Sequence, residues 1–267
     1  MPCEITRAAF TRANRAAWNA SAPLHETGEE WEQMLAAAAR PDFCVLDETL
    51  INLLSGLDLA GKAAVQVGCN NARELLSLAA LGLRPVLGID QSGAFLNQAR
   101  RLCAVSGLSP RLVEADIYDL PEGLGQHGLA LVTIGVVNWM PDLPGFFRAV
   151  ASLLAEGGVL VIYETHPFLE MFDPASATPF APATSYFRRD PFPVTDAISY
   201  DGLAHGPGET GYWFVHRLGE IVTSCAGAGL TIVSLEEYAH SNREVDYDIY
   251  EGREPQLPLS YSLVARR

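Results

Sequence analysis

Short apolar runs alternate along most of the chain with segments whose apolar residues recur at helical spacing. The runs suited to strands cover residues 64–67, 85–89, 111–115, 129–134 and 159–163. The segments between them place apolar residues three and four positions apart, which is typical of helices packed on a sheet. Five strands that alternate with helices predict a doubly wound α/β fold around a parallel sheet.

The pattern changes at both ends of this core. Residues 1–50 are rich in alanine and predict a helical N-terminal cap, followed by the main domain over residues 51–267. Residues 166–214 hold seven of the seventeen prolines and many aromatic residues, which indicates a lid insertion rather than a linker. Residues 230–235 and 259–265 are strand-like with no helix between them, so we expect an antiparallel C-terminal hairpin. The predicted fold is therefore a Rossmann-like, seven-stranded, mostly parallel sheet.

The turn after the first predicted strand has the character of a ligand-binding site. It consists of the small and polar residues 68–72, and Asp90 ends the next strand 22 positions after Gly68. In a βαβ unit such a turn lets a ligand approach the backbone, and a carboxylate there accepts hydrogen bonds from a ribose diol. The alternative is an ordinary tight turn beside a solvated aspartate.

Composition narrows the function classes. The formal net charge of −14 opposes binding to phosphate backbones, so we expect no nucleic-acid partner. The five cysteines are scattered without a CxxC pair, and no metal site is indicated. No apolar run is long enough for a membrane span and the N-terminus lacks a signal-peptide core, so we expect a cytoplasmic protein.

Five motifs in order resemble those of the class I S-adenosylmethionine-dependent methyltransferases. The family's acidic-x-Gly-x-Gly-x-Gly turn corresponds to Gln66-Val67-Gly68-Cys69-Asn70-Asn71-Ala72, in which Gln66 replaces the acidic residue and only the first glycine remains. Asp90-Gln91 corresponds to the ribose-binding position, Asp116-Ile117 to the acidic-apolar pair that holds the adenine, and LLAEGGVLVIYE to the helix-to-strand passage. The fifth likeness is the terminal hairpin.

The resemblance implies S-adenosylmethionine as the cofactor, S-adenosylhomocysteine as its product, and a set of residues that bind it. Replacement of the family's acid by Gln66 weakens a usual contact to the amino acid portion of the cofactor. The implied cofactor-binding residues are Gly68, Cys69, Asn70, Asn71, Asp90, Gln91, Asp116, Ile117, Gly135 and Val136.

A narrower likeness to a bacterial subgroup of small-molecule methyltransferases rests on NRAAWN, CNNARELLSL, TIGVVNWMPDL, YETHPF and PLSYSL. In that subgroup the N-terminal segment folds over cofactor and acceptor. We therefore expect a small planar, aromatic or heterocyclic acceptor, such as one of secondary metabolism. The predicted acceptor-binding residues are Asn14, Arg15, Trp18, Asn138, Trp139, His166 and Trp213.

His166 is also the candidate general base. It directly follows the fifth predicted strand, and an imidazole titrates near neutrality. The alternative role is a hydrogen bond to the lid or to the acceptor.

Two other functions stay open from the sequence. A nicotinamide-dependent oxidoreductase shares the βαβ unit and the ribose acid, but Arg73 stands where its last small residue is expected. A non-catalytic cofactor-binding protein fits the degenerate turn. The sequence leaves open whether nitrogen, oxygen or carbon is methylated, and whether the protein is a monomer or a homodimer.

Overall fold

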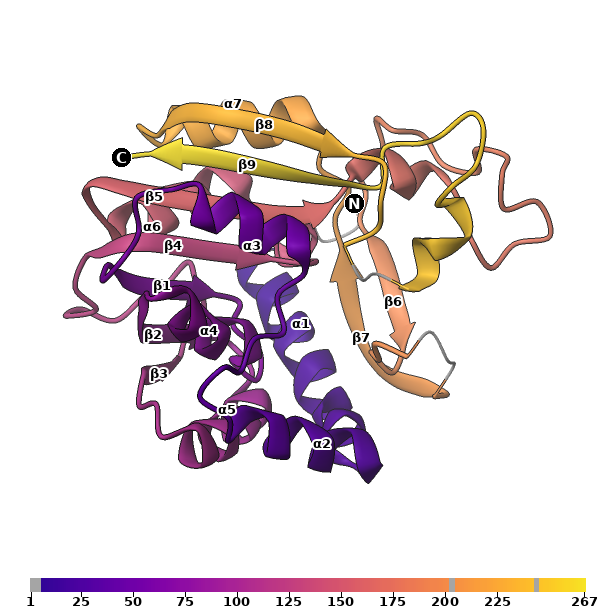
Figure 1. Cartoon of the computed structure of the whole chain (residues 1–267). Coiled ribbons are helices and arrows are strands. Elements are labelled where there is room, and N and C mark those ends of the chain that lie inside the picture. The colour runs from indigo at the N-terminus through magenta and orange to yellow at the C-terminus, as the bar shows by residue number, and fades with distance from the viewer. Residues whose placement is uncertain (1–5, 202–204, 243–244) are drawn as a thin grey trace.

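One seven-stranded sheet organises the chain. The computed structural model describes residues 6–201, 205–242 and 245–267. The strand order is β3-β2-β1-β4-β5-β9-β8, with parallel pairing among β1 to β5 and antiparallel pairing of β9 with both β5 and β8 (Figure 1). The sheet strands are β1 (Ala63–Val67), β2 (Arg84–Asp90), β3 (Arg111–Glu114), β4 (His127–Thr133), β5 (Leu154–Thr165), β8 (Thr231–Tyr238) and β9 (Ser260–Arg266). The predicted fold class, including the antiparallel terminal pair, is confirmed.

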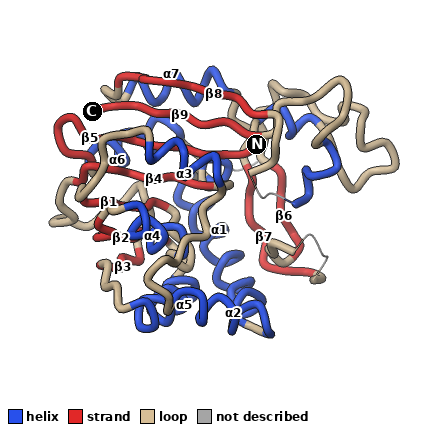
Figure 2. The backbone as a smooth tube through the Cα atoms, viewed as in Figure 1, coloured by secondary structure: helices blue, strands red, loops and turns tan. Residues whose placement is uncertain are grey.

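Helices cover both faces of this sheet (Figure 2). The α-helices are α1 (Arg7–Ser21), α2 (Gly28–Ala38), α3 (Glu48–Ser55), α4 (Arg73–Ser77), α5 (Gly93–Ser106), α6 (Leu143–Ser152) and α7 (Leu218–Gly227). Short 3₁₀ segments are η1 (Ala22–Glu26), η2 (Leu78–Leu81), η3 (Val137–Trp139), η4 (Pro167–Met171) and η5 (Val245–Tyr250). No helix among the described residues is long and apolar enough to cross a membrane.

The apolar runs divide between two cores because successive strand residues point to opposite faces. In β4, Ala130 and Val132 belong to the core that includes Phe146 of α6. Leu129 and Leu131 belong to the core on the other face, formed with α3, α4 and α5. Both faces are buried, which explains why the parallel strands read as unbroken apolar runs.

Local sequence signals set the ends of several elements. Ser92 caps α5 by accepting a hydrogen bond from the backbone N–H of Phe95, and Gly107 ends that helix in the left-handed conformation. The segment between β1 and β2 is not one continuous helix, because the short α4 is followed by the 3₁₀ turn η2. The strand expected from Val159 begins earlier, at Leu154, which pairs with His127.

The lid insertion contains a second sheet that the sequence did not reveal. Strands β6 (Phe192–Asp196) and β7 (Pro207–Trp213) pair antiparallel, and this ribbon lies beside α1 (Figure 1). Pro193 and Pro207 made these strands hard to predict from the sequence. Proline within a strand is confined to edge strands, strand starts and bulges, so its presence argues against a strand.

Asn14 joins α1 to this ribbon and to the main domain. Its side chain is fully buried. Its Nδ2 donates to the carbonyls of Trp139 (3.1 Å) and Tyr212 (3.2 Å), and its Oδ1 accepts from the N–H of Tyr212 (2.7 Å). One amide therefore fastens three segments that are distant in the sequence.

We expect Asn14→Ala to lower the free energy of unfolding by about 2–4 kcal/mol, because the buried carbonyl of Trp139 and two half-buried backbone groups of Tyr212 would lose their partner. Urea denaturation followed by circular dichroism measures this change. The exposed Asn52 of α3 offers a matched control, Asn52→Ala, which should leave stability nearly unchanged. Equal effects of the two substitutions would contradict the fastening role of Asn14.

Candidate active site

The turn after β1 keeps the shape of a glycine-rich turn with only one glycine. Gly68, Asn70 and Ala72 all have positive φ, at 66°, 51° and 64°. Asparagine tolerates this conformation well, whereas alanine adopts it at an energetic cost. A Cβ on Gly68 would lie 2.5 Å from Cγ2 of Val136, so the close approach of the two turns requires glycine at this position.

The turn after β4 is held by a buried carboxylate. Ile134 and Gly135 both have positive φ, at 32° and 85°. The fully buried Glu164, near the end of β5, accepts hydrogen bonds from the N–H groups of Gly135 and Val137. This contact fixes the turn that carries Val136 and the start of η3.

A cavity of about 310 Å³ opens at the carboxyl ends of β1, β2 and β4. That volume lies in the range of small-molecule sites. The lining residues are Thr11, Trp18, Gln66, Val67, Gly68, Asn70, Arg73, Glu74, Ile89, Asp90, Gln91, Ala115, Asp116, Ile117, Tyr118, Thr133, Ile134, Val136, Trp139, Met140 and Tyr200. The carboxyl edge of a parallel sheet is the expected place for a ligand.

Asp90 is a buried acid of the cavity wall. Its carboxylate accepts hydrogen bonds from the N–H groups of Asn70 (2.7 Å) and Ser92 (2.8 Å). Burial outweighs these bonds and raises the pKa of Asp90 to about 6. The carboxylate therefore links the β1 turn to the start of α5 while it faces the cavity.

A second acidic position follows β3. Asp116 accepts a hydrogen bond from the N–H of Tyr118 (3.0 Å), which fixes the loop that carries Ile117. The Tyr118 hydroxyl donates to the carbonyl of Asp142 (3.0 Å), and burial raises its pKa. These contacts place an acid, an apolar side chain and an aromatic ring on one wall.

Four aromatic residues, Trp18, Tyr118, Trp139 and Tyr200, surround the remaining space. Trp18 packs edge-on against Trp139, with ring centroids 5.4 Å apart. Tyr200 accepts a hydrogen bond from Nδ2 of Asn70 (3.2 Å), and the Arg73 guanidinium lies 5.4 Å from the centre of its ring. The N-terminal helix and the lid insertion thus close one side of the cavity.

The comparisons with known proteins agree with this architecture. A family profile described as a methyltransferase domain matches residues 64–158. These residues of the chain are therefore similar to a methyltransferase domain. No curated protein matches the sequence.

Solved structures extend the likeness beyond this domain. The CcbJ methyltransferase from Streptomyces caelestis is 14% identical, with a TM-score of 0.58 and coverage of 95% of this chain and 98% of that chain. A putative S-adenosylmethionine-dependent methyltransferase from Listeria monocytogenes is 18% identical, with a TM-score of 0.55 and coverage of 89% and 97%. The geranyl diphosphate C-methyltransferase from Streptomyces coelicolor A3(2) is 14% identical, with a TM-score of 0.54 and coverage of 82% and 78%. The solved structures share the fold of this chain, and together with the domain match they are consistent with the predicted recognition of a class I S-adenosylmethionine-dependent methyltransferase.

Most of the cofactor-binding residues predicted for the methyltransferase line the cavity. The lining members are Gly68, Asn70, Asp90, Gln91, Asp116, Ile117 and Val136. Three others do not belong to the lining of the cavity. Cys69 is fully buried on the side of Gly88, Asn71 accepts from the N–H of Arg73, and Gly135 donates to Glu164.

Some of the predicted acceptor-binding residues line the cavity and others do not. Trp18 and Trp139 line the cavity. Asn14 is occupied by its structural hydrogen bonds, and Asn138 donates to the carbonyl of Phe214 (3.0 Å). Two more stand outside the lining set: Arg15 is exposed on α1, and Trp213 packs behind Trp139 with ring centroids 5.3 Å apart.

His166 does not reach the cavity, so the prediction of a general base is not supported. Its Nδ1 accepts a hydrogen bond from the N–H of Phe168 (3.1 Å), which assigns the proton to Nε2. That atom contacts Oε1 of Glu237 at 2.8 Å. Burial lowers the pKa of His166, with Glu237 opposing the shift. The neutral imidazole therefore links Glu237 of β8 to Phe168 at the start of the lid insertion through hydrogen bonds.

Sequence reasoning missed Arg73, Glu74, Tyr118 and Tyr200 as wall residues. Arg73 and Glu74 directly follow the degenerate glycine turn, and Tyr118 directly follows Asp116-Ile117, so adjacency to a motif was the available signal. Tyr200 lies 130 positions from its partner Asn70, and no local pattern indicates that contact.

Behind the aromatic wall lies a second perturbed acid, Glu170 of η4. It accepts a hydrogen bond from Nε1 of Trp213 (2.8 Å), and burial raises its pKa from 4.5 to about 7. A carboxyl with a raised pKa binds its proton more tightly in the folded state than in the unfolded chain. Its stabilising effect is therefore complete below pH 4.5 and is lost as the pH rises through 7.

Glu170→Gln should remove the loss of stability that occurs as the pH rises through 7, because glutamine does not titrate. Its amide oxygen can still accept the hydrogen bond from Trp213. We expect the variant to be more stable than wild type at pH 8 by about 1–3 kcal/mol and to show little gain at pH 5. Urea denaturation at both pH values measures the difference. A gain that did not depend on pH would show that Glu170 is not the titrating group.

Proposed function

We propose that this methyltransferase binds S-adenosylmethionine in the cavity and transfers its methyl group to a small planar, aromatic or heterocyclic metabolite. The observation that carries the proposal is the convergence of the Gly68 turn, Asp90 and Asp116 on one cavity. In this proposal, Asp90 accepts hydrogen bonds from the ribose hydroxyls, Asp116 and Ile117 flank the adenine, and the turn contacts the amino acid portion.

Two features of the wall fit such a cofactor. Gly68 lines the cavity and has no side chain that would separate a ligand from its backbone. Within the described part of the chain, the buried Oε1 of Gln66 has no hydrogen-bond partner although its side chain lines the cavity. A ligand with hydrogen-bond donors would satisfy this oxygen.

When bound, the cofactor supplies a methyl group activated by the positive charge of its sulfonium. The chain supplies alignment and exclusion of water, which are the main requirements of an in-line displacement. Trp18, Trp139 and Tyr200 form rigid walls against which a planar acceptor would stack. No histidine belongs to the described lining, which supports transfer by approximation to an acceptor that is already nucleophilic.

Names of structural neighbours are consistent with small acceptors. One neighbour is a glycopeptide N-methyltransferase in complex with S-adenosylmethionine, and another is the geranyl diphosphate C-methyltransferase. Mass spectrometry of the denatured purified protein tests cofactor binding directly. Retained S-adenosylhomocysteine supports the proposal, a retained nicotinamide dinucleotide contradicts it, and labelled methyl transfer into a metabolite pool then identifies the acceptor.

Asp90→Ala should weaken S-adenosylmethionine binding at least about tenfold, because a charged hydrogen-bond acceptor typically contributes 1.5–3 kcal/mol. Wild-type affinity should also fall as the pH drops below 6, since the ribose hydroxyls need the ionised form of Asp90. Calorimetry at pH 5 and pH 7.5 measures both effects. Asp58→Ala, at an exposed position, is the control; unchanged affinity in Asp90→Ala would reject this role.

His166→Asn should keep kcat within about threefold of wild type, whereas loss of a general base costs about 10²–10⁴-fold. The acidic limb of the pH–rate profile should persist in the variant, because His166 lies outside the cavity. Steady-state kinetics from pH 5 to 9 checks this, once an acceptor is known. Disappearance of that limb would restore the base assignment.

A further inference from the structure

Gln66 leaves the cavity without an acid at the end of β1. Its side chain is buried, and its Nε2 donates to Oγ1 of Thr133 (3.1 Å). Its Oε1 has no hydrogen-bond partner among the described residues. A neutral amide oxygen accepts a hydrogen bond from an ammonium group, yet it does not neutralise the charge.

A carboxylate from the next element lines the same cavity as this amide. Glu74, in the first turn of α4, is only 6% exposed and lines the same cavity. Gln66 and Glu74 therefore line one cavity although they come from different elements, β1 and α4. Burial of a charged carboxylate at a cavity wall is costly unless a cation or donors face it.

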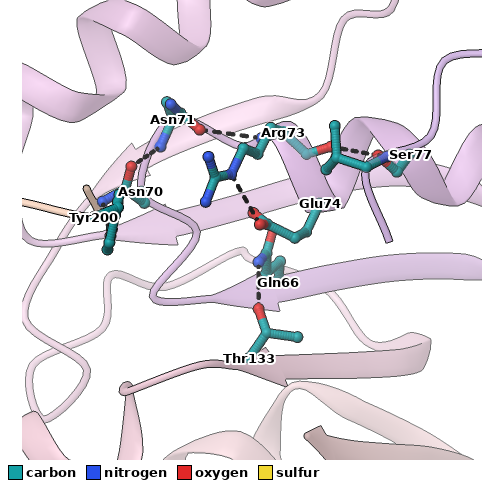
Figure 3. A network of polar contacts seen from close by, with 9 residues as sticks. Gln66, Asn70, Asn71, Arg73, Glu74, Ser77, Thr133 and Tyr200 are labelled. Atoms are coloured by element: carbon teal, nitrogen blue, oxygen red, sulfur yellow. Dashed lines mark hydrogen bonds and ion pairs between the residues drawn. The ribbon is translucent and has the colours of Figure 1, made fainter. Parts of the chain in front are cut away.

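Arg73 supplies the opposite charge on the far side of Glu74 (Figure 3). Its Nε lies 3.0 Å from Oε1 of Glu74, and its guanidinium lies 5.4 Å from the centre of the Tyr200 ring. Among the described residues, Arg73 donates a side-chain hydrogen bond through Nε, and the acceptor is Oε1 of Glu74. The two terminal nitrogens are suited to a bidentate contact with a ligand carboxylate.

An α-amino acid group carries one ammonium and one carboxylate on a single carbon, and this corner of the cavity presents an anion next to a cation. From this match we propose that Glu74 and Arg73 form an amino acid clamp. Glu74 and Oε1 of Gln66 receive the ammonium of the S-adenosylmethionine amino acid portion, and Arg73 receives its carboxylate. Glu74 thereby provides the charge that Gln66 lacks. This inference rests on the proposed function and specifies the part of the ligand that each residue recognises.

Three ligands separate the two roles by calorimetry: S-adenosylhomocysteine, its decarboxylated analogue, which keeps the amine, and methylthioadenosine, which lacks the whole amino acid portion. Glu74→Gln should weaken the first two at least about tenfold and leave methylthioadenosine within about twofold. Arg73→Gln should weaken S-adenosylhomocysteine alone. Arg100→Gln, on the exposed face of α5, is the matched control and should change none of the three.

Retained binding of methylthioadenosine also shows that each variant is folded. The clamp is overturned if both variants bind S-adenosylhomocysteine as wild type does, or if each loses all three ligands equally. If Glu74→Gln does not fold, the binding of the decarboxylated analogue to Arg73→Gln still tests the clamp. The clamp requires that Arg73→Gln bind this analogue as tightly as wild type does. A wild-type protein that binds none of the ligands rejects the proposed function itself, whereas normal methylthioadenosine binding with no preference for S-adenosylhomocysteine rejects only the clamp.

Discussion

The buried carboxylate of Glu164 holds the part of the structure on which the site depends. It binds the N–H groups of Gly135 and Val137, so the turn after β4 keeps an otherwise unfavourable conformation at Ile134. Backbone strain of this kind persists only when the surroundings determine it. The turn then presses Val136 against Gly68, which sets the distance between the two strand ends that border the cavity.

The same turn carries the attachment of the N-terminal helix. Trp139 follows directly in η3, and its carbonyl accepts from Asn14, which in turn holds Tyr212 of β7. The rings of Trp18 and Trp139 meet across this junction. The turns that border the cavity and the aromatic residues Trp18 and Trp139 are therefore connected through one set of hydrogen bonds. A shift in the turn after β4 would move both.

The sequence predicted the sheet because its signals are local. Apolar runs, the Ser92 and Asp142 caps and the left-handed Gly107 each depend on a few neighbouring residues. The same holds for Asp90 and Asp116, which end or follow strands and must lie at one edge of a parallel sheet. Three residues that were predicted as contacts, Cys69, Asn71 and Gly135, do not line the cavity, because a motif assigns a segment to the site but not the direction of each side chain.

The contacts of the lid insertion and the role of His166 were harder to predict from the sequence, because they depend on residues that are distant along the chain. The contacts of Tyr200 with Asn70 and of Asn14 with Tyr212 join residues more than 100 positions apart, and no periodicity encodes them. His166 does follow β5, as expected, but its two ring nitrogens are committed to Phe168 and Glu237. Position after a strand predicted where the residue lies, and only the hydrogen-bond partners revealed that it turns away from the cavity.

The charges of the cavity wall also bear on which nucleoside ligand it suits. Glu74, Asp90 and Asp116 contribute three carboxyl groups to the described lining, against the single guanidinium of Arg73. An excess of acids attracts a ligand with a sulfonium and an ammonium, and it repels the two negative charges of a dinucleotide pyrophosphate. The positive-φ turn alone would accommodate either ligand. The electrostatics of its neighbours favour the methyl donor, and they do so most strongly above pH 6, where Asp90 is ionised.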